Sequence, residues 1–135
     1  VIDVSLHGFF HAVQPLLLPM ARMRFGRIVC VSSVAAVLGN RGQANYAAAK
    51  SALHGAAKSL AREMASRGIT VNVVAPGVIQ GRMADAAFPP ELVKQMVPAG
   101  RAGTPEDVAA LVAFLASDSA GYINGQIIGI DGGMS

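Results

Sequence analysis

Apolar residues along this chain form short β-branched runs, separated by longer segments of helical spacing. The runs RIVCVS at residues 27–32 and ITVNVVA at residues 69–75 are typical of strands buried on both faces of a sheet. A third run, QIIGI at residues 126–130, predicts the last strand. Because these strands alternate with helical segments, the pattern predicts right-handed βαβ units and a parallel sheet, an α/β fold.

Two long helices are predicted before and after the first strand. Residues 2–23 are expected to form a helix that is strained or kinked at Pro15 and Pro19, because proline lacks the N–H that a helix interior needs. Residues 44–67 predict a longer, alanine-rich helix. Gly68 ends it, since glycine readily takes the left-handed conformation found at helix ends.

A third helix is predicted to begin at Thr104. The sequence Thr-Pro-Glu-Asp supplies an N-cap hydroxyl, a proline at the first position and two acids in the first turn. This helix is expected to run to about Ser117. Residues 77–103, which contain glycines and two adjacent prolines, are expected to be irregular, with room for one short helix.

The composition suits part of a domain better than a whole one. Hydrophobic residues make up 53% and charged residues 14% of the 135 residues, whereas about 25% charged is usual. A small protein exposes much of its surface and needs charge to cover it. The chain also begins at Val1 inside a predicted helix, and a sheet of three strands has open edges. We therefore expect residues 1–135 to be the inner part of something larger.

Several classes of function are disfavoured by charge and cysteine content. The net charge of +3 is small and scattered, so nucleic-acid binding is not expected. No membrane span is predicted, and no signal peptide is apparent. The single Cys30 lies within a predicted strand and is expected to be a buried, inert thiol, which fits a cytoplasmic protein.

The candidate chemistry lies in Tyr46 and Lys50, which are four residues apart on a predicted helix and so project from the same side. The phenol of free tyrosine has a pKa of about 10, and a neighbouring ammonium favours its phenolate form, which makes proton exchange practical. Ser33 follows the carboxyl end of the first predicted strand, where open α/β sheets bind ligands. Its hydroxyl is expected to share the same substrate oxygen.

A Tyr-x-x-x-Lys pair also occurs by chance on solvated helix faces, so this pair alone is a weak signal. A second strand that ends in Pro76-Gly77 strengthens it, because this dipeptide turns the chain sharply and leaves backbone groups to face a ligand.

Several motifs together, in order, resemble the short-chain dehydrogenase/reductases. They are Ser33, Tyr46-Ala-Ala-Ala-Lys50, Asn72-Val-Val-Ala-Pro76-Gly77 and Asp131-Gly132-Gly133. The segments GNRGQANYAAAK, SLAREMASRGITVNVVAPG, VPAGR and AFLASD are most similar to the 3-oxoacyl-[acyl-carrier-protein] reductases of that family. The resemblance runs along the whole chain. It implies the carboxyl-terminal part of a single Rossmann-like, doubly wound domain, with the dinucleotide-phosphate turn upstream of Val1.

The resemblance implies reduction of a 3-oxoacyl thioester with a nicotinamide cofactor, NADPH by preference, with NADH also possible. Tyr46 would donate a proton to the carbonyl oxygen, which Ser33 would orient. Lys50 would hold the cofactor ribose and favour the phenolate. Pro76 and the residues after it, notably the backbone of Ile79, would hold the carboxamide.

Two positions depart from the family pattern. Ser5 stands where the family has an asparagine that supports a water in the proton relay. Gly81 stands where a threonine commonly contacts the cofactor, so a weaker grip on the cofactor or a more mobile loop is expected.

The chain has three histidines, His7, His11 and His54. His7 and His11 are four residues apart, but without an acidic partner at ligand spacing no metal site is predicted. His54 follows Lys50 by four residues along an alanine-rich face and is expected to serve helix packing.

The resemblance also implies partners. Family members are commonly tetramers, paired through the first two long helices across one axis and through the last helix and strand across another. Acyl carrier proteins are acidic, and related reductases dock them with two arginines that match Arg24 and Arg67 here. In a parallel sheet these two are expected near one edge, close to the mouth of the site. The alternative is that both are ordinary solvated charges beside turns.

Two other functions stay open at this point. One is a family member that acts on another secondary alcohol or ketone, such as a steroid, sugar or small alcohol. The other is an inactive module that only mediates assembly, which would leave Ser33, Tyr46 and Lys50 without a reason to occur together.

Overall fold

The computed structural model describes all residues, 1–135. In chain order the elements are the π-helix η1 (Asp3–His7), α1 (Gly8–Met23), β1 (Gly26–Val31), α2 (Ala35–Leu38), α3 (Ala44–Met64), the 3-10 helix η2 (Ala65–Arg67), β2 (Ile69–Pro76), α4 (Arg82–Ala87), α5 (Pro90–Met96), α6 (Pro105–Ala116), the 3-10 helix η3 (Asp118–Ala120) and β3 (Ile127–Ile130).

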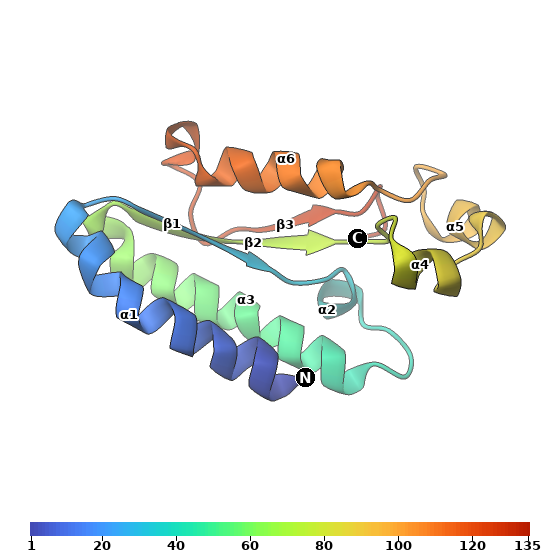
Figure 1. Cartoon of the computed structure of the whole chain (residues 1–135), viewed down its shortest axis with the longest axis horizontal. Coiled ribbons are helices and arrows are strands. Elements are labelled where there is room, and N and C mark those ends of the chain that lie inside the picture. The colour runs from blue at the N-terminus through green and yellow to red at the C-terminus, as the bar shows by residue number, and fades with distance from the viewer.

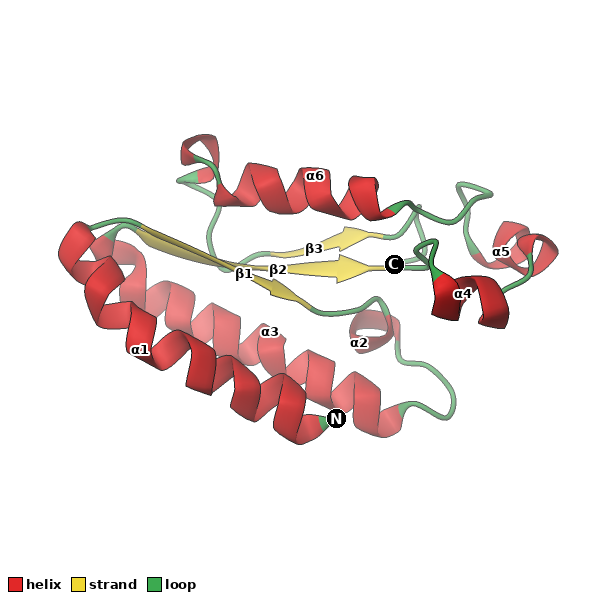
Figure 2. Ribbon diagram, viewed as in Figure 1, coloured by secondary structure: helices red, strands yellow, loops and turns green.

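The fold has three layers, with the sheet in the middle (Figures 1 and 2). The strands are parallel and lie in the order β1-β2-β3, with Gly26 beside Ile69 and Val73 beside Ile127. Helices α1 and α3 cover one face of the sheet and α6 covers the other. The predicted α/β fold with a parallel sheet is therefore confirmed.

The core lies between β2 and α3. Ile69, Val71 and Val73 alternate along β2, so their side chains point to the same face, where they meet Ala57 and Ala61 of α3. These alanines are four residues apart and form one stripe of the helix, whose small side chains let the backbone approach the sheet closely. On the other face, Leu115 of α6 is fully buried.

Most of the predicted elements are present. The first helix contains both Pro15 and Pro19 within α1, and it begins with the π-helical turn η1. The alanine-rich helix continues through η2 to Gly68, whose φ of 73° is left-handed as expected. Helix α6 begins with a full capping box between Thr104 and Asp107.

The prediction for residues 77–103 was wrong, because this segment contains two helices, α4 and α5. Helix α5 follows Pro89, with Pro90 at its first position. The first N–H of a helix has no partner within the helix, so a proline at that position loses no hydrogen bond. The two adjacent prolines, which suggested an irregular chain, therefore begin a helix. Helix α2 was also missed, because four residues are too few to show helical spacing.

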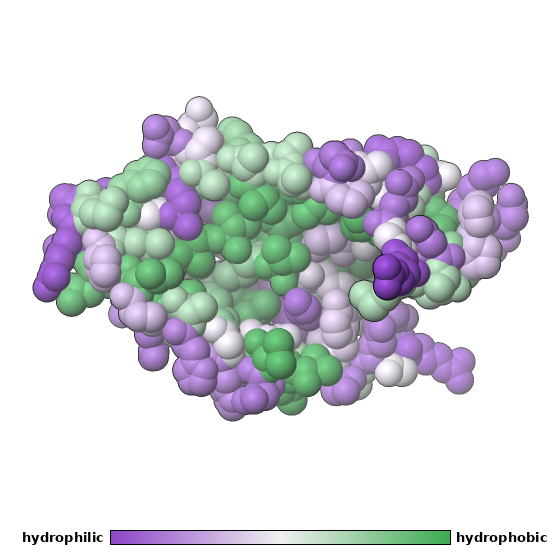
Figure 3. Space-filling model, in the orientation of Figure 1, coloured by the Kyte–Doolittle hydropathy of each residue, from purple (hydrophilic) through white to green (hydrophobic).

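The edge strand β1 pairs only with β2 and leaves apolar side chains uncovered. Phe25 and Val31, at its two ends, are 40% and 50% exposed. Figure 3 shows hydrophobic side chains gathered on this side of the molecule, between α6 and the helices of the opposite layer. No helix combines the length and the hydropathy needed to cross a bilayer.

Candidate active site

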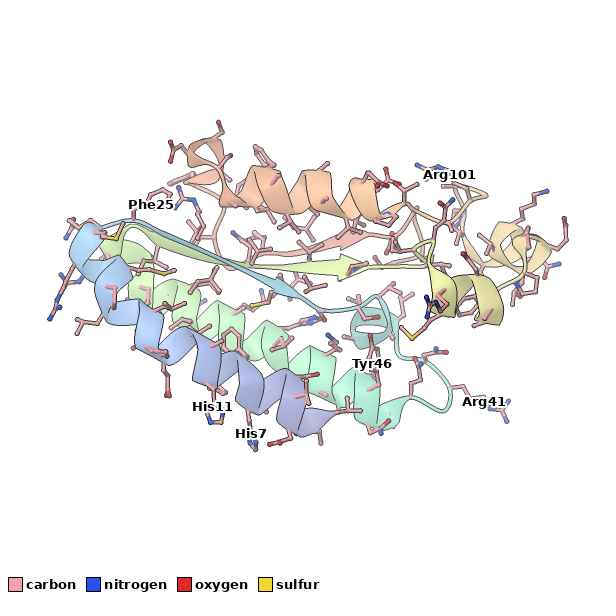
Figure 4. The ribbon with its side chains drawn as sticks, in the orientation of Figure 1. His7, His11, Phe25, Arg41, Tyr46 and Arg101 are labelled. Carbon is pink, nitrogen blue, oxygen red and sulfur yellow. The ribbon has the colours of Figure 1, made fainter.

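Tyr46 and Lys50 come together at the carboxyl end of β1. The Lys50 Nζ donates a hydrogen bond to the Val31 carbonyl oxygen at 3.1 Å, and it lies 6.0 Å from the centroid of the Tyr46 ring. Figure 4 shows Tyr46 in the first turns of α3, beside α2. Helical spacing puts the phenol and the ammonium on one side of α3, and the bond to Val31 turns that side toward the sheet.

Ser33 lies two residues beyond the carbonyl that Lys50 contacts. It is half-buried, and its Oγ accepts a hydrogen bond from the N–H of Ala35 at 3.2 Å, which begins helix α2. The hydroxyl proton of Ser33 has no acceptor in the structure, and a hydroxyl both donates and accepts. Ser33 is therefore held by one hydrogen bond and retains a donor for a ligand.

The loop after β2 lies at the same edge of the sheet. The Val34 N–H donates to the Pro76 carbonyl oxygen at 2.8 Å, so the loops that follow β1 and β2 are joined. An added Cβ at Gly77 would lie 2.9 Å from the Cα of Asp131, so only glycine fits beside the end of β3.

Ile79 presents its backbone to this edge. It forms an isolated parallel bridge with Gly103, in which the Gly103 N–H donates to Val78 and the Gln80 N–H donates to Gly103, at 2.9 and 2.8 Å. Both bonds are made by the neighbours of Ile79, whose own N–H and C=O have no partner. Unpaired backbone groups are costly unless water or a ligand meets them, so this pair is suited to bind an amide.

The two positions that depart from the family pattern lie at the margins of the site. Ser5 is half-buried in η1, which packs against α3. Gly81 directly precedes α4, and its N–H donates to the Asp85 carboxylate at 3.4 Å.

Arg24 and Arg67 lie close together at the opposite, amino edge of the sheet. The Arg24 Nη2 donates to the Ser66 carbonyl oxygen at 3.0 Å, beside Arg67. In Figure 4 the labelled Phe25, next to Arg24, lies at the far end of the sheet from Tyr46. The two arginines therefore share one edge, as expected. Their expected position near the mouth of the site is wrong within one chain. Both residues precede strands, and in a parallel sheet the residues that precede strands lie at the edge opposite the carboxyl ends.

His54 and Ser32 form a contact that the sequence did not suggest. The Nε2 of His54 lies 2.8 Å from the Oγ of Ser32, which also donates to the Lys50 carbonyl oxygen at 3.2 Å. Burial, and then the charge of Lys58, lower the pKa of His54. His54 therefore also joins α3 to the end of β1, which the expectation of helix packing did not include. The tandem serines at the end of the strand were the signal that could have revealed it.

Two further predictions concern Cys30 and the exposed histidines. Burial raises the pKa of Cys30 to about 11, which confirms a buried thiol of low reactivity. The claim that His7 lacks an acidic partner was wrong, because its Nδ1 lies 2.7 Å from the Asp3 carboxylate. No three potential metal-binding side chains gather anywhere in the chain.

A hollow of about 590 Å³ lies away from Ser33, Tyr46 and Lys50. It lies between the outer face of α3 and the residues leading into β3, and its lining includes Lys58, Arg62 and Gln126. A smaller cavity of about 340 Å³ lies at the carboxyl edge, beside Val78 and Asp131.

Comparison with known proteins gives sequence matches over nearly the whole chain. A family model described as enoyl-(acyl carrier protein) reductase matches residues 1–135. Relatives named 3-oxoacyl-[acyl-carrier-protein] reductase FabG match 99% of the chain: those of Aggregatibacter actinomycetemcomitans, Escherichia coli K12 and Staphylococcus aureus Mu50 are 47%, 48% and 52% identical.

The chain spans only 55–56% of the length of these relatives. The stretch that the family model matches contains Ser33, Tyr46 and Lys50. The chain belongs to the short-chain dehydrogenase/reductase family.

Proposed function

We propose that residues 1–135 form the catalytic part of an oxidoreductase that reduces a 3-oxoacyl thioester on acyl carrier protein to the 3-hydroxyacyl thioester, in fatty acid synthesis. The observation that carries the proposal is the contact of Lys50 with the end of β1, which holds it beside Tyr46 and close to Ser33. The printed names of the relatives support the substrate class.

A nicotinamide cofactor fits the carboxyl edge. The unpaired N–H and C=O of Ile79 complement a carboxamide, which has one acceptor and a donating NH₂ group. Pro76 and Gly77 begin the turn that presents Ile79, and Gly81 ends it. The ammonium of Lys50 is placed to donate to ribose hydroxyls. When bound, the cofactor supplies a hydride, and we propose NADPH as the form used, with NADH as the alternative.

The chain itself manages the proton. The phenol of Tyr46 donates its proton to the ketone oxygen, and the free hydroxyl proton of Ser33 orients that oxygen by hydrogen bonding. The ammonium of Lys50 stabilises the phenolate that Tyr46 becomes. Ser5, in the element packed against α3, holds a water that returns a proton, in place of the asparagine usual in the family.

The direct test is an assay of the full-length protein with NADPH and with NADH. Its substrates are a 3-oxoacyl thioester, the corresponding 2-enoyl thioester, and a panel of steroid, sugar and small-alcohol ketones. We expect 3-oxoacyl reduction to be fastest, with the 3-hydroxyacyl thioester as product. Faster enoyl reduction would favour the activity in the family model's description, and faster reduction of a simple ketone the other alternative. No reduction of any substrate would favour an assembly module.

We also propose that the chain is the carboxyl-terminal part of one Rossmann-like domain. The open edge of β1 and the exposed Phe25 and Val31 support this, because a longer sheet would cover them. The 135-residue chain alone is then expected to bind NADPH too weakly to detect and to self-associate. Micromolar binding of NADPH to this chain in calorimetric titration would contradict the proposal.

A homotetramer is the proposed assembly, in the cytoplasm. Helix α1 exposes Phe10, Leu16 and Leu18, and α6 exposes Phe114, so both helical layers present apolar side chains to solvent. The buried, unpaired Cys30 suits a reducing compartment. Sedimentation of the full-length protein at micromolar concentration tests the assembly, and a single monomeric species would contradict it.

Docking of the acidic carrier protein is proposed to use Arg24 and Arg67. Because both lie at the amino edge, the carrier would contact this edge while its acyl chain reaches a site elsewhere in the assembly. The exposed guanidinium groups supply long-range attraction for an acidic partner.

A further inference from the structure

The end of β1 and one turn of α3 are joined by two sets of contacts. Lys50 donates from Nζ to the Val31 carbonyl oxygen, while Ser32, the next residue, is bonded to the backbone of Lys50 and to the ring of His54. Ser32 is itself fixed in the sheet, because its N–H donates to the Val74 carbonyl oxygen at 2.8 Å. Lys50 is therefore held both at its ammonium and at its carbonyl.

The hydrogen bonds of Ser32 define the state of His54. A serine hydroxyl has one proton, so both contacts are satisfied when Ser32 donates to the Lys50 carbonyl oxygen and accepts the Nε2–H of His54. A side chain of similar bulk without an N–H would leave the buried Ser32 oxygen short of a donor. Ser32 is only 4% exposed, so water is a poor substitute.

We propose that His54 is a positioning residue, which acts through Ser32 to hold Lys50 and the following Ser33 in register. The imidazole touches neither substrate nor cofactor in this scheme. It fixes the hydroxyl of Ser32, which fixes the turn of α3 that carries Lys50, and Ser33 is covalently next to Ser32. The catalytic part of the inference rests on the proposed function, whereas the contact itself does not.

The first test measures Lys50 without measuring activity. In the full-length protein, the rate at which an amine-reactive reagent labels Lys50 is followed by mass spectrometry in His54→Leu, Ser32→Ala, His54→Gln and the control Ser59→Ala. Losing one hydrogen bond is expected to speed labelling about fivefold in His54→Leu and in Ser32→Ala. His54→Gln keeps an N–H donor at similar reach and is expected to label within twofold of the parent. Ser59 is exposed one turn further along α3, and its variant is expected to match the parent.

The second test measures turnover of the 3-oxoacyl thioester in the same variants. We expect kcat to fall about fivefold in His54→Leu, as for one lost hydrogen bond, with KM for the thioester within twofold and kcat recovered in His54→Gln. If His54→Leu does not fold, Ser32→Ala carries both tests. Labelling at the parent rate in a folded His54→Leu or Ser32→Ala variant would overturn the positioning role. A kcat of His54→Gln as low as that of His54→Leu would overturn it too. A parent protein without reductase activity would overturn the proposed function and leave the labelling test intact.

Discussion

The carboxyl edge of the sheet leaves polar groups without partners, whereas the backbone N–H groups in the turns at the amino edge are paired within the chain. At the carboxyl edge, the hydroxyl proton of Ser33 and both backbone groups of Ile79 are free. At the amino edge, the N–H groups of Arg24, Gly26 and Gly68 all donate to carbonyl oxygens. The carboxyl edge therefore has groups free to bind a ligand, whereas the hydrogen bonds at the amino edge stabilise the turns of the chain.

The turns at the amino edge are closely packed. The φ of Gly68 is 73°, and a Cβ placed there would lie 2.2 Å from the carbonyl oxygen of Arg24. Arg27 stacks over the ring of Phe25, 4.5 Å from its centroid, and donates to the Ser117 carbonyl oxygen at the end of α6. Changes that disturb this packing are therefore expected to affect stability, whereas removal of the Tyr46 proton donor at the carboxyl edge is expected to affect turnover.

The largest effect is expected for Tyr46→Phe, which removes one proton donor at the carboxyl edge. Turnover of the 3-oxoacyl thioester should fall about a thousandfold, as for loss of a general acid. Stability and cofactor affinity should be nearly unchanged, because the ring remains. Steady-state kinetics measure turnover, and fluorescence titration with NADPH measures cofactor affinity. Turnover within a few-fold of the parent would show that Tyr46 is not the acid.

The matching change at the amino edge is Gly68→Ala. Left-handed strain of about 1–2 kcal/mol and overpacking of about 1–3 kcal/mol are expected to lower the free energy of unfolding by about 4 kcal/mol in total. Gly42→Ala is the control, since Gly42 has a similar φ of 79° with open space around it, and it should show the strain alone. Urea unfolding measures the free energy of unfolding of the two variants and the parent. Equal losses would mean that Arg24 moves aside at little cost.

The comparison is sharpened by reversing two charges at the amino edge, Arg24→Glu together with Arg67→Glu. Activity on acyl carrier protein thioesters should fall about tenfold and become less sensitive to salt, through lost electrostatic steering. Activity on a small thioester mimic should barely change. Equal losses on both substrates, or none on either, would contradict docking of a carrier protein at this edge.

The smallest effect is expected for Asp131→Asn, after the last strand. Partial burial acts to raise the pKa of Asp131, but hydrogen bonds from Ser135 and from the backbone of Gly133 and Met134 hold it below its ordinary 3.8. A lowered folded-state pKa stabilises the fold above about pH 4, and this contribution is lost as the pH falls through the folded-state value.

The asparagine variant should therefore be less stable at pH 7, by about 0.5 kcal/mol after solvent screening, with the difference shrinking toward pH 3. Urea unfolding at several pH values measures this. The control is Asp118→Asn, because the Asp118 carboxylate makes no hydrogen bond in the structure, and its stability should follow that of the parent. A gap between Asp131→Asn and the parent that widened toward acid pH would refute the stabilising role.

Periodicity and motif spacing predicted the parts of the molecule that depend on neighbours in sequence. The strands, the helix of Tyr46 and Lys50, and the capping box at Thr104 are of this kind. What could not be predicted depends on pairing across elements, such as Ser32 with His54, which are 22 residues apart. The position of Arg24, by contrast, could have been predicted. Arg24 precedes a strand of a parallel sheet, which places it at the edge opposite to the site.

The bridge between Ile79 and Gly103 has a consequence for how such a protein can diversify. The bridge holds together both ends of the segment 80–102, which contains α4 and α5. It thereby fixes the register of the Ile79 backbone, which faces the proposed cofactor. The entropy of closing a loop grows only with the logarithm of its length, and each doubling costs roughly 0.6 kcal/mol. Insertions and deletions at the exposed turns of this segment, away from the buried Val93 and Val97, are therefore expected to cost little, and the segment can diversify while the reacting groups stay in place.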